Sequence, residues 1–256
     1  MLATEQGQKI VLINTGGISC KNCGLGVFCL ADDLQAYELE QLVAIVKRRI
    51  ILGRGDHLYR MGSQFRSIFA VRTGSLKTYT LSENGAEQIT GFHFPSELVG
   101  LDAITKRLHP SAAQALEKTT LCELPYDRLE TLAQQRSPVR RQLIRLMSKE
   151  VLANSEHITL LGKKDAKARL ATLLLRFVRR FEQRGFSTRE FHLSMSRSDI
   201  GNHLGLSTET ISRLFTSFQR LGLISVDRKL VKIHDHDALL LFAGDTGEAE
   251  AQRLQG

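Results

Sequence analysis

Apolar residues recur at the spacing of a helix face in three stretches of the chain. The first runs from Asp32 to Ile50, with charged residues between the apolar ones. The second opens at Ser137 and continues to about Leu161, and the proline at position 138 suits a first helical turn that a serine can cap. A strongly basic third stretch runs from Gly162 to Gly185 and also has an apolar face. This pattern predicts three amphipathic helices.

Between the first two stretches, from Ile51 to about Leu124, the pattern changes to short β-prone runs. They are Ser67–Val71, Leu76–Leu81 and Gln88–Phe94, and glycine-containing turns separate them. The pair Asn84-Gly85 is a hairpin signal. The segment is expected to form a compact antiparallel β-roll or barrel.

The second helical stretch has apolar positions spaced alternately three and four residues apart, as the a and d positions of a coiled coil are. One polar residue, Asn154, interrupts the stripe, and a single polar residue at such a position sets register and oligomeric state. A helix packed on its own β-roll would also be amphipathic, but the length and the lone asparagine favour a homodimer. The predicted dimer interface comprises Ile144, Met147, Val151, Asn154, Ile158 and Leu161.

The most specific local pattern lies between Ser196 and Phe218. Ile200 and Leu204 form a helical face, Gly205 stands where a helix ends and the chain reverses, and Ser207 can cap the next helix. The buried stripe of that next helix is predicted to be Ile211, Leu214, Phe215 and Phe218. This arrangement is typical of a helix-turn-helix, and a plain helical hairpin explains it less well.

The exposed face of the second helix carries polar side chains near its N-terminus, where a recognition helix meets base edges. Arginine can bind guanine O6 and N7, and glutamate can accept from cytosine N4. The segments Leu223–Val226 and Leu230–Ile233 flank Asp227-Arg228-Lys229, which predicts a two-stranded wing with a basic tip near phosphate. RNA binding is less favoured, because surface aromatics for base stacking are lacking. The predicted DNA-contacting residues are Glu209, Ser212, Arg213, Arg197 and Thr208.

Composition agrees with a nucleic-acid partner without requiring one. The chain has 256 residues, 42% of them hydrophobic, a net charge of +8 and a pI near 9.5. The length suggests about two domains, and no apolar run is long enough to span a bilayer. The N-terminus shows no signal-peptide pattern, so a reducing cytoplasmic location is expected. Neither paired carboxylates nor a nucleophile–base set is evident, so an enzyme is not expected.

Four cysteines are candidate metal ligands, namely Cys20, Cys23, Cys29 and the distant Cys122. Thiolates select zinc or iron–sulfur clusters. Three ligands on one glycine-bearing loop with a remote fourth suit a cubane, whereas zinc more often uses two close pairs. Spacing alone favours the cluster only modestly. Cys122 has apolar neighbours and could instead be a small buried hydrophobe.

Arm, β-roll, dimer helix and winged helix-turn-helix follow one another in the order found in the Crp/Fnr family of bacterial regulators. Over residues 15–242 the chain resembles the oxygen-responsive fumarate and nitrate reductase regulator (FNR/ANR) type within that family. The resemblance matches all four cysteines and the spacing of Glu209, Ser212 and Arg213. It implies a [4Fe–4S] cluster that promotes dimerisation and that oxygen degrades to [2Fe–2S]. It also implies palindromic DNA of the TTGAT-N4-ATCAA type.

The resemblance further implies activation through contacts with RNA polymerase. The surface loop around Glu83–Gly85 and the turn Arg184–Phe186 are the candidate contacts, and Glu130 and Arg140 are a candidate bridge between β-roll and helix. An Asp at the seam position of Asn154 can oppose dimerisation in this subgroup by like-charge repulsion. A neutral Asn is therefore expected to move the resting balance toward the dimer.

Many relatives bind a cyclic nucleotide in the β-roll, which requires a cationic partner for the phosphate. The corresponding segments here are Ser96–Gly100 and His109–Ala113, and Pro110-Ser111 stand where the family has Arg-Ser or Arg-Thr. A buried phosphate without a partner would be costly, so no cyclic nucleotide is expected. A zinc-stabilised repressor without a redox role remains the other alternative.

The sequence therefore predicts an α+β chain with an N-terminal β-roll sensor domain, a long dimerisation helix and a C-terminal winged helix-turn-helix. The expected divisions are a flexible arm (1–19), the cysteine loop and β-roll (20–136), the dimerisation helix (137–161), the DNA-binding domain (162–243) and a flexible tail (244–256).

Overall fold

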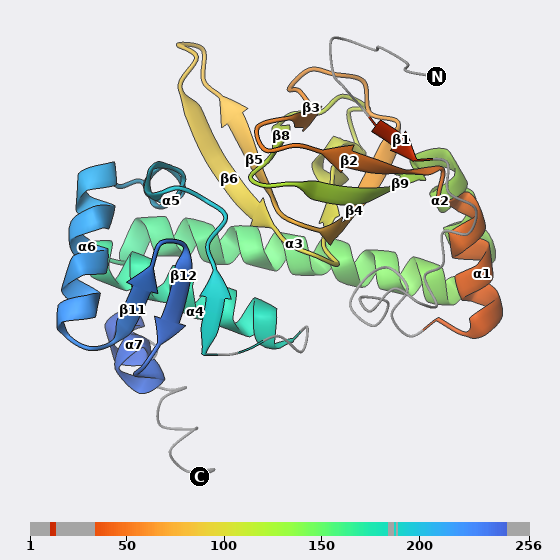
Figure 1. Cartoon of the computed structure of the whole chain (residues 1–256). Helices are drawn as coiled ribbons and strands as arrows, with labels where there is room; N and C mark the ends of the chain where they lie inside the picture. The colour runs from red at the N-terminus through yellow and green to blue at the C-terminus, as the bar shows by residue number, and fades with distance from the viewer. Residues whose placement is uncertain (1–10, 14–33, 184–186, 188, 245–256) are drawn as a thin grey trace. The chain divides into compact units, whose positions relative to one another are not determined.

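The computed structural model describes residues 11–13, 34–183, 187 and 189–244 (Figure 1). Most of the predicted arm and of the tail, and the first three cysteines, lie outside these residues. The chain divides between Val151 and Leu152 into two compact units. Val11–Ile13, within the predicted arm, form strand β1, which pairs with β2.

The first unit is built on two antiparallel sheets. One has the order β1-β2-β9-β4-β7 and the other the order β3-β8-β5-β6. The three predicted β-runs are confirmed as β4, β5 and β6, and the predicted β-roll is therefore present. The strands after β1 are β2 (Arg48–Leu52), β3 (His57–Tyr59), β4 (Ser67–Thr73), β5 (Leu76–Leu81), β6 (Glu87–His93), β7 (Leu98–Val99), β8 (Ala112–Ala115) and β9 (Thr119–Pro125).

The first helix is shorter than its periodicity predicts. Helix α1 covers Ala36–Ile45 rather than reaching Ile50, because Arg48–Leu52 enter the sheet and pair with β9. Two β-branched residues in this run suit a pleated strand. Sequence periodicity could not show that these residues would pair with a strand far along the chain.

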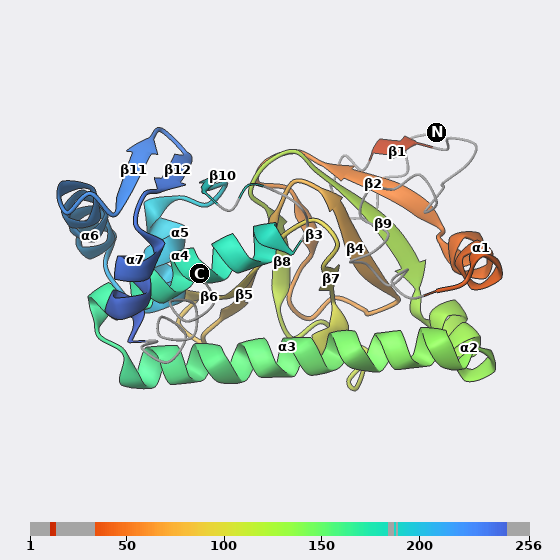
Figure 2. The ribbon, with the colours of Figure 1, turned by 90° about the horizontal axis from the view of Figure 1, so that it is seen from below.

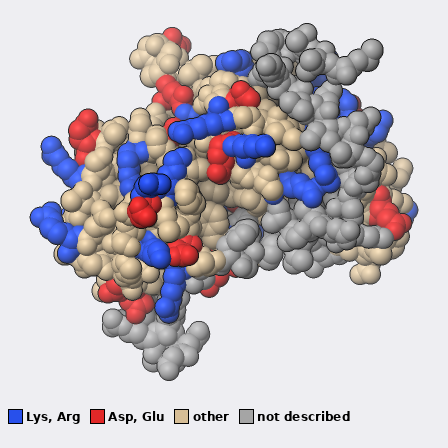
Figure 3. All heavy atoms as spheres, viewed as in Figure 1, with Lys and Arg blue, Asp and Glu red and all other residues tan. Residues whose placement is uncertain are grey.

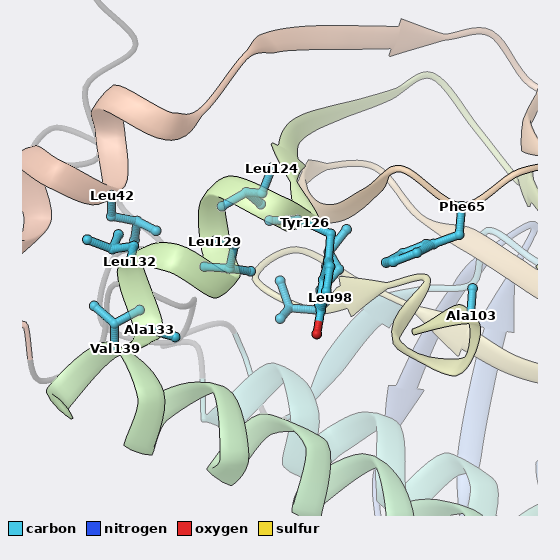
Figure 4. Packing of buried hydrophobic residues seen from close by; sticks show 12 residues of the cluster. Leu42, Phe65, Leu98, Ala103, Leu124, Tyr126, Leu129, Leu132, Ala133 and Val139 are labelled. Carbon is cyan, nitrogen blue, oxygen red and sulfur yellow. The ribbon is translucent and has the colours of Figure 1, made fainter. Parts of the chain in front are cut away.

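A short helix that the sequence did not predict, α2 (Tyr126–Gln135), continues directly from β9 and leads into α3 (Ser137–Lys163). The core of this part of the unit contains Leu42 from α1, Leu132 from α2 and Val139 from α3 (Figure 4). Each of these side chains is buried. The first turns of α3 are therefore anchored by the same apolar cluster that holds α1 and α2.

Helix α3 is one unbroken helix of 27 residues (Figure 2). It begins at the predicted residue and continues two residues past the predicted end. It crosses the division between the two units, so its residues up to Val151 belong to the first unit and the later ones to the second. No described helix is both long enough and apolar enough to cross a membrane.

The second unit contains the end of α3, four further helices and a three-stranded sheet of order β10-β12-β11. Phe177, Ile200 and Phe218 are fully or almost fully buried in its core. The wing predicted from the sequence is confirmed as β11 and β12, while β10 was not predicted. The bounds are α4 (Ala166–Glu182), β10 (Glu190–His192), α5 (Arg197–Leu204), α6 (Thr208–Arg220), β11 (Ile224–Asp227), β12 (Leu230–Ile233) and α7 (His236–Ala243).

The turn between β4 and β5 requires glycine on two grounds. Gly74 has φ +79°, and a Cβ there would lie 2.5 Å from the Lys118 carbonyl oxygen and from Thr119 Oγ1. Gly85 has almost the same φ, +78°, but open space around the Cβ position. We expect Gly85→Ala to cost about 1–2 kcal/mol of unfolding free energy from the left-handed backbone alone. Gly74→Ala should cost about 1–3 kcal/mol more, from overlap with its neighbours.

Thermal and urea unfolding of the two variants, followed by circular dichroism, measures this difference. Gly85→Ala serves as the matched control, because it introduces the same backbone strain without the overlap. Equal losses of stability in the two variants would contradict the expectation.

Candidate nucleic-acid interface and cysteine site

The turn between α5 and α6 is built by local capping. Ser196 and Asp199 form a reciprocal capping box at the start of α5, in which the Asp199 amide donates to Ser196 Oγ at 3.0 Å. Gly205 ends α5 in the left-handed region at φ +63°. Ser207 then caps α6, accepting from the Thr210 amide at 3.1 Å. These contacts confirm the predicted helix-turn-helix and its predicted caps.

A close backbone approach holds the two helices together. A Cβ at Gly201 of α5 would lie 2.6 Å from the Leu206 carbonyl oxygen, so this position also needs glycine. On the other side of the contact, Ile211 and Phe215 of α6 are buried, as the predicted stripe requires. The opposite face of α6 is thereby turned to solvent.

Glu209, Ser212 and Arg213 are all exposed, in the first two turns of α6. The Glu209 backbone amide and then the Ser207 hydroxyl hydrogen-bond the Glu209 carboxylate and hold its pKa below the usual range. The Ser212 hydroxyl donates to the Thr208 carbonyl at 2.9 Å, which leaves its oxygen able to accept. The three side chains together offer an anion, a hydroxyl and a guanidinium on one helix face.

The other two predicted DNA contacts differ from each other. Thr208 is the first residue of α6 and is exposed. Arg197 is half-buried, with its guanidinium carbon 3.2 Å from the centroid of the Phe215 ring. Burial lowers the pKa of Arg197 to about 10, so the group is still charged at neutral pH. Arg197 thus packs α5 against α6 by a cation–π contact rather than standing free on the surface.

The wing presents a tight basic turn. Arg228, at its tip, is exposed and has a left-handed backbone with φ +54°. Lys229 is half-buried and its Nζ lies 3.4 Å from the Ser194 carbonyl oxygen. Figure 3 shows basic side chains spread over the described surface, with acidic side chains among them. On this face the basic side chains do not form one uninterrupted patch.

Much of the predicted seam of α3 is exposed. In the first unit, Ile144 and Val151 are 59% and 65% exposed, and in the second unit Ile158 is 72% exposed. Met147 and Asn154 are also exposed, while Leu161 is half-buried. Leu152, outside the predicted seam, is 60% exposed, so the sequence analysis missed one exposed apolar residue of this helix.

The end of α3 meets α5 within the second unit. The His157 ring stacks on the His203 ring of α5, with centroids 4.1 Å apart and planes 10° apart. Beside them Arg176 of α4 forms an ion pair with Glu156 at 3.2 Å. Nothing in the local periodicity indicated this contact, because it joins residues far apart in the chain.

Cys122, the one cysteine among the described residues, is half-buried on β9. Its nearest strand partners are Arg49 on β2 and Ala70 on β4. It packs against the apolar cluster that contains Leu42 of α1 and Val139 of α3. A soft thiol ligand in apolar surroundings fits an iron–sulfur group or zinc. Cys20, Cys23 and Cys29 lie outside the described residues.

The segment that corresponds to a phosphate-binding cassette carries an acid. Ser111 is buried, and its hydroxyl donates to the Asp102 carboxylate at 2.6 Å. Next to it the His109 ring stacks on the Tyr59 ring at 3.7 Å. Asp102 follows Gly100, which turns the chain with φ +94°. The hydroxyl that could meet a phosphate is thus already hydrogen-bonded to a carboxylate.

Known proteins with similar sequences and folds are transcription regulators. Residues 168–242 match the Crp-like helix-turn-helix domain, and residues 49–136 match the cyclic nucleotide-binding domain. The transcriptional activator protein anr of Pseudomonas aeruginosa is 49% identical over 225 residues, 88% of this chain and 92% of the relative. The fumarate and nitrate reduction regulatory protein of Escherichia coli is 45% identical over 236 residues, covering 91% and 94%.

Among solved structures, FixK2 from Bradyrhizobium japonicum superposes with a TM-score of 0.70 at 28% sequence identity. The match covers 76% of this chain and 96% of that one. It confirms the predicted fold class, a β-roll domain of the cyclic nucleotide-binding type followed by a helix-turn-helix domain.

The buried stack at the end of α3 makes the stability of the protein sensitive to acid. Burial, and then the charge of Arg176, lower the pKa of His157 below its ordinary value of 6.5. Below about pH 6.5 the unfolded chain therefore binds a proton that the folded chain does not, and folding stability falls as pH falls toward the folded pKa. When the pH is lowered from about 7.5 to about 5.5, we expect the free energy of unfolding to fall less in His157→Gln than in the parent.

Thermal unfolding of both proteins at the two pH values measures the difference. His192→Gln, which changes an exposed histidine of the same unit, is the control and should lose as much as the parent. A parent-like loss in His157→Gln would contradict the expectation.

Proposed function

Because the chain belongs to the Crp/Fnr family of transcription regulators and is of the FNR/ANR type, we propose that it activates genes of anaerobic metabolism by binding DNA as an oxygen-sensitive homodimer. The observation that carries this proposal is the capped helix-turn-helix with Glu209, Ser212 and Arg213 exposed on one face of α6. The protein is a transcription regulator and not an enzyme, and its relatives are transcription regulators too.

The proposed DNA site is a palindrome of the TTGAT-N4-ATCAA type. Arg213 would bind a guanine in the major groove through two parallel hydrogen bonds, and Glu209 would accept from a cytosine amino group. Ser212 would meet a base edge or a phosphate with its free lone pair. Arg228 at the wing tip would bind phosphate, which sets the position of the unit on the duplex without reading sequence.

The homodimer would form along α3. The exposed side chains of Ile144, Val151 and Ile158 are apolar, and water-exposed apolar surface favours association. Full burial of such a side chain contributes about 1.5–3 kcal/mol. Two copies of α3 would bury them together with Met147, and Asn154 at the same face would favour one register. Two recognition helices could then reach half-sites about one helical turn apart.

The proposed sensor is a [4Fe–4S] cluster held by Cys20, Cys23, Cys29 and Cys122. When bound, such a cluster supplies a redox-active group whose integrity depends on oxygen. The location of Cys122 supports a link to the dimer, because this residue packs in the core that also anchors α1 and the first turns of α3. Leu42 of α1 and Val139 of α3 belong to that core, so a shift at the cysteine site would be transmitted to the dimer helix by direct packing.

Cyclic nucleotide binding is not part of the proposal, although residues 49–136 match a cyclic nucleotide-binding domain. The Asp102 carboxylate, hydrogen-bonded to Ser111, would repel a phosphate at the corresponding position. Activation would proceed through contacts with RNA polymerase. The tip of the β5–β6 hairpin, Glu83–Gly85, is exposed and available for such a contact, whereas the second candidate, Arg184–Phe186, lies outside the described residues.

Arg213→Ala tests the reading of DNA by α6. Loss of a bidentate contact to guanine should weaken binding to the TTGAT-N4-ATCAA duplex by about 1–3 kcal/mol and relax specificity at that base pair. Fluorescence anisotropy with the parent duplex and with a duplex changed at that pair measures both effects at one salt concentration. Arg220→Ala, an exposed arginine at the far end of α6, removes the same charge and serves as the control. Similar losses on all duplexes in both variants would show that Arg213 binds phosphate only.

Metal content tests the sensor. Protein purified without oxygen should contain iron and sulfide in equal amounts and absorb in the visible range. A small addition of air should bleach that absorption in parallel with loss of the dimer in sedimentation and loss of DNA binding. The Cys122→Ser variant should lack the cluster and remain monomeric. A variant that keeps the cluster and the dimer would contradict the role of Cys122 as a ligand. Protein that contains zinc, or a cluster indifferent to air, would exclude the oxygen switch and leave DNA binding intact.

A further inference from the structure

Arg169, in the first turns of α4, donates hydrogen bonds to the ends of two other helices. Its Nη2 donates to the Leu161 carbonyl at 2.7 Å, in the last turn of α3, and its Nε to the Lys164 carbonyl at 2.9 Å, one residue after the end of α3. Its Nη1 donates to the Leu204 carbonyl at 2.9 Å, at the C-terminus of α5. One half-buried guanidinium therefore joins the end of α3 to the end of α5 inside the second unit.

The chemistry of this contact makes it directional. The last carbonyls of a helix lack partners within the helix and carry partial negative charge. The guanidinium is planar and always charged, and its donors point along fixed directions. A lysine at the same position would supply one point charge, which cannot face three carbonyls in this geometry. The contact thus defines an angle between the two helix ends as well as a distance.

A second contact close by restricts the same pair of helices. His157 of α3 lies one turn before Leu161, and it stacks on His203 of α5, the residue before Leu204. Gly205 lies beside the same guanidinium, since a Cβ at this position would be in ordinary contact with Arg169 Nη1 at 3.5 Å. The hydrogen bond from Arg169 and the histidine stack hold α5 at two points, so α5 cannot rotate about either point alone.

The position of the recognition helix α6 is determined by the position of α5. Gly201 and Leu206 are in close backbone contact across the turn, and the buried side chain of Ile211 on α6 lies beside Gly201 of α5. Ile158, exposed on the same final turns of α3, belongs to the seam proposed to pair with a second copy. The path from the dimer axis to the base-reading face thus runs from α3 through the Arg169 contact to α5 and then to α6.

We propose that Arg169 is the residue that sets the spacing of DNA half-sites accepted by the dimer, by fixing α5, and with it α6, at one angle to the end of α3. This inference rests on the homodimer of the proposed function. A residue that only stabilised the unit would weaken binding to every duplex alike. A residue that sets the angle affects the simultaneous binding of two half-sites and leaves a single half-site unaffected.

The test uses oxygen-free full-length protein and four duplexes. They contain the palindrome with its natural spacer, with one base pair added, with one base pair removed, and a single half-site. Arg169→Met removes the guanidinium and keeps an unbranched side chain of similar length. Lys167→Met, at an exposed position of the same helix, removes the same charge and is the matched control. Sedimentation and thermal unfolding of each protein accompany the binding measurements.

The parent and Lys167→Met should prefer the natural spacer. Arg169→Met should lose about tenfold in affinity for the natural palindrome, while its affinity for the single half-site changes less than about twofold. The palindromes with the three spacers should therefore bind this variant with nearly equal affinity. Arg169→Lys should behave like the methionine variant because it lacks the planar donors. If Arg169→Met does not fold, the lysine variant, which keeps the charge, provides the test.

A dimeric variant that retains the parent's spacer preference would overturn the inference and leave the proposed function intact. Equal losses on the half-site and the palindrome would overturn it as well, because they indicate a role in stability or phosphate binding. A parent protein that is monomeric under these conditions would overturn the proposed dimer and, with it, this inference.

Discussion

Helix α3 exposes a row of large apolar side chains to water, and the proposed homodimer depends on how that row is covered. Ile144, Val151 and Ile158 are each more than half exposed, and they recur along one helix. Pairing of two such rows would bury only a few side chains per copy, each contributing about 1.5–3 kcal/mol. An association of that size is dependent on concentration and can be shifted by a few kcal/mol. The proposed oxygen switch would require a dimer interface of this modest strength.

Both ends of α3 are fixed to the unit in which they lie. At the first end Val139 is buried in a core shared with Leu42 of α1 and with the side chain of Cys122. At the last end the Leu161 and Lys164 carbonyls accept from Arg169. The first attachment is apolar, so it tolerates small sliding movements, whereas the second is made of directional hydrogen bonds that define an angle. Adjustable packing therefore occurs at the Cys122 end of α3 and rigid geometry at the end that lies in the helix-turn-helix unit.

Sequence reasoning succeeded where the determinants of structure lie within a few residues of one another. The helix-turn-helix was predicted because the cap at Ser207, Gly205 and the apolar stripe are all local signals. It failed where a distant partner decides. Helix α1 ends at Ile45 because Arg48–Leu52 pair with β9, and no periodicity reveals that pairing.

The same distinction between local signals and distant partners applies to the candidate site residues. The exposed face of α6 is where the residue pattern predicted it, because helix periodicity determines which side chains share a face. The contact of Arg197 with Phe215 was not predicted, since a stacked arginine and a surface arginine look alike in sequence. The contact of Arg197 with DNA stays a prediction. Arg169 gave no signal at all, because its three partners are backbone carbonyls, which every residue has. Such contacts become visible only when the helix ends have been placed.

Glu209 adds a constraint that the basic residues around it cannot supply. An ionised carboxylate on a surface that approaches a polyanion is repelled by phosphate, so it weakens binding to duplexes of any sequence. Hydrogen bonds at the start of α6 keep its pKa low, so the group does not escape this repulsion by protonation near neutral pH. The cost is recovered only where a base presents a donor to the carboxylate, as cytosine does in the major groove. In the proposed complex Arg213 would supply attraction and Glu209 would penalise the wrong sequences. The ratio of specific to non-specific affinity would then depend on having both on one helix face.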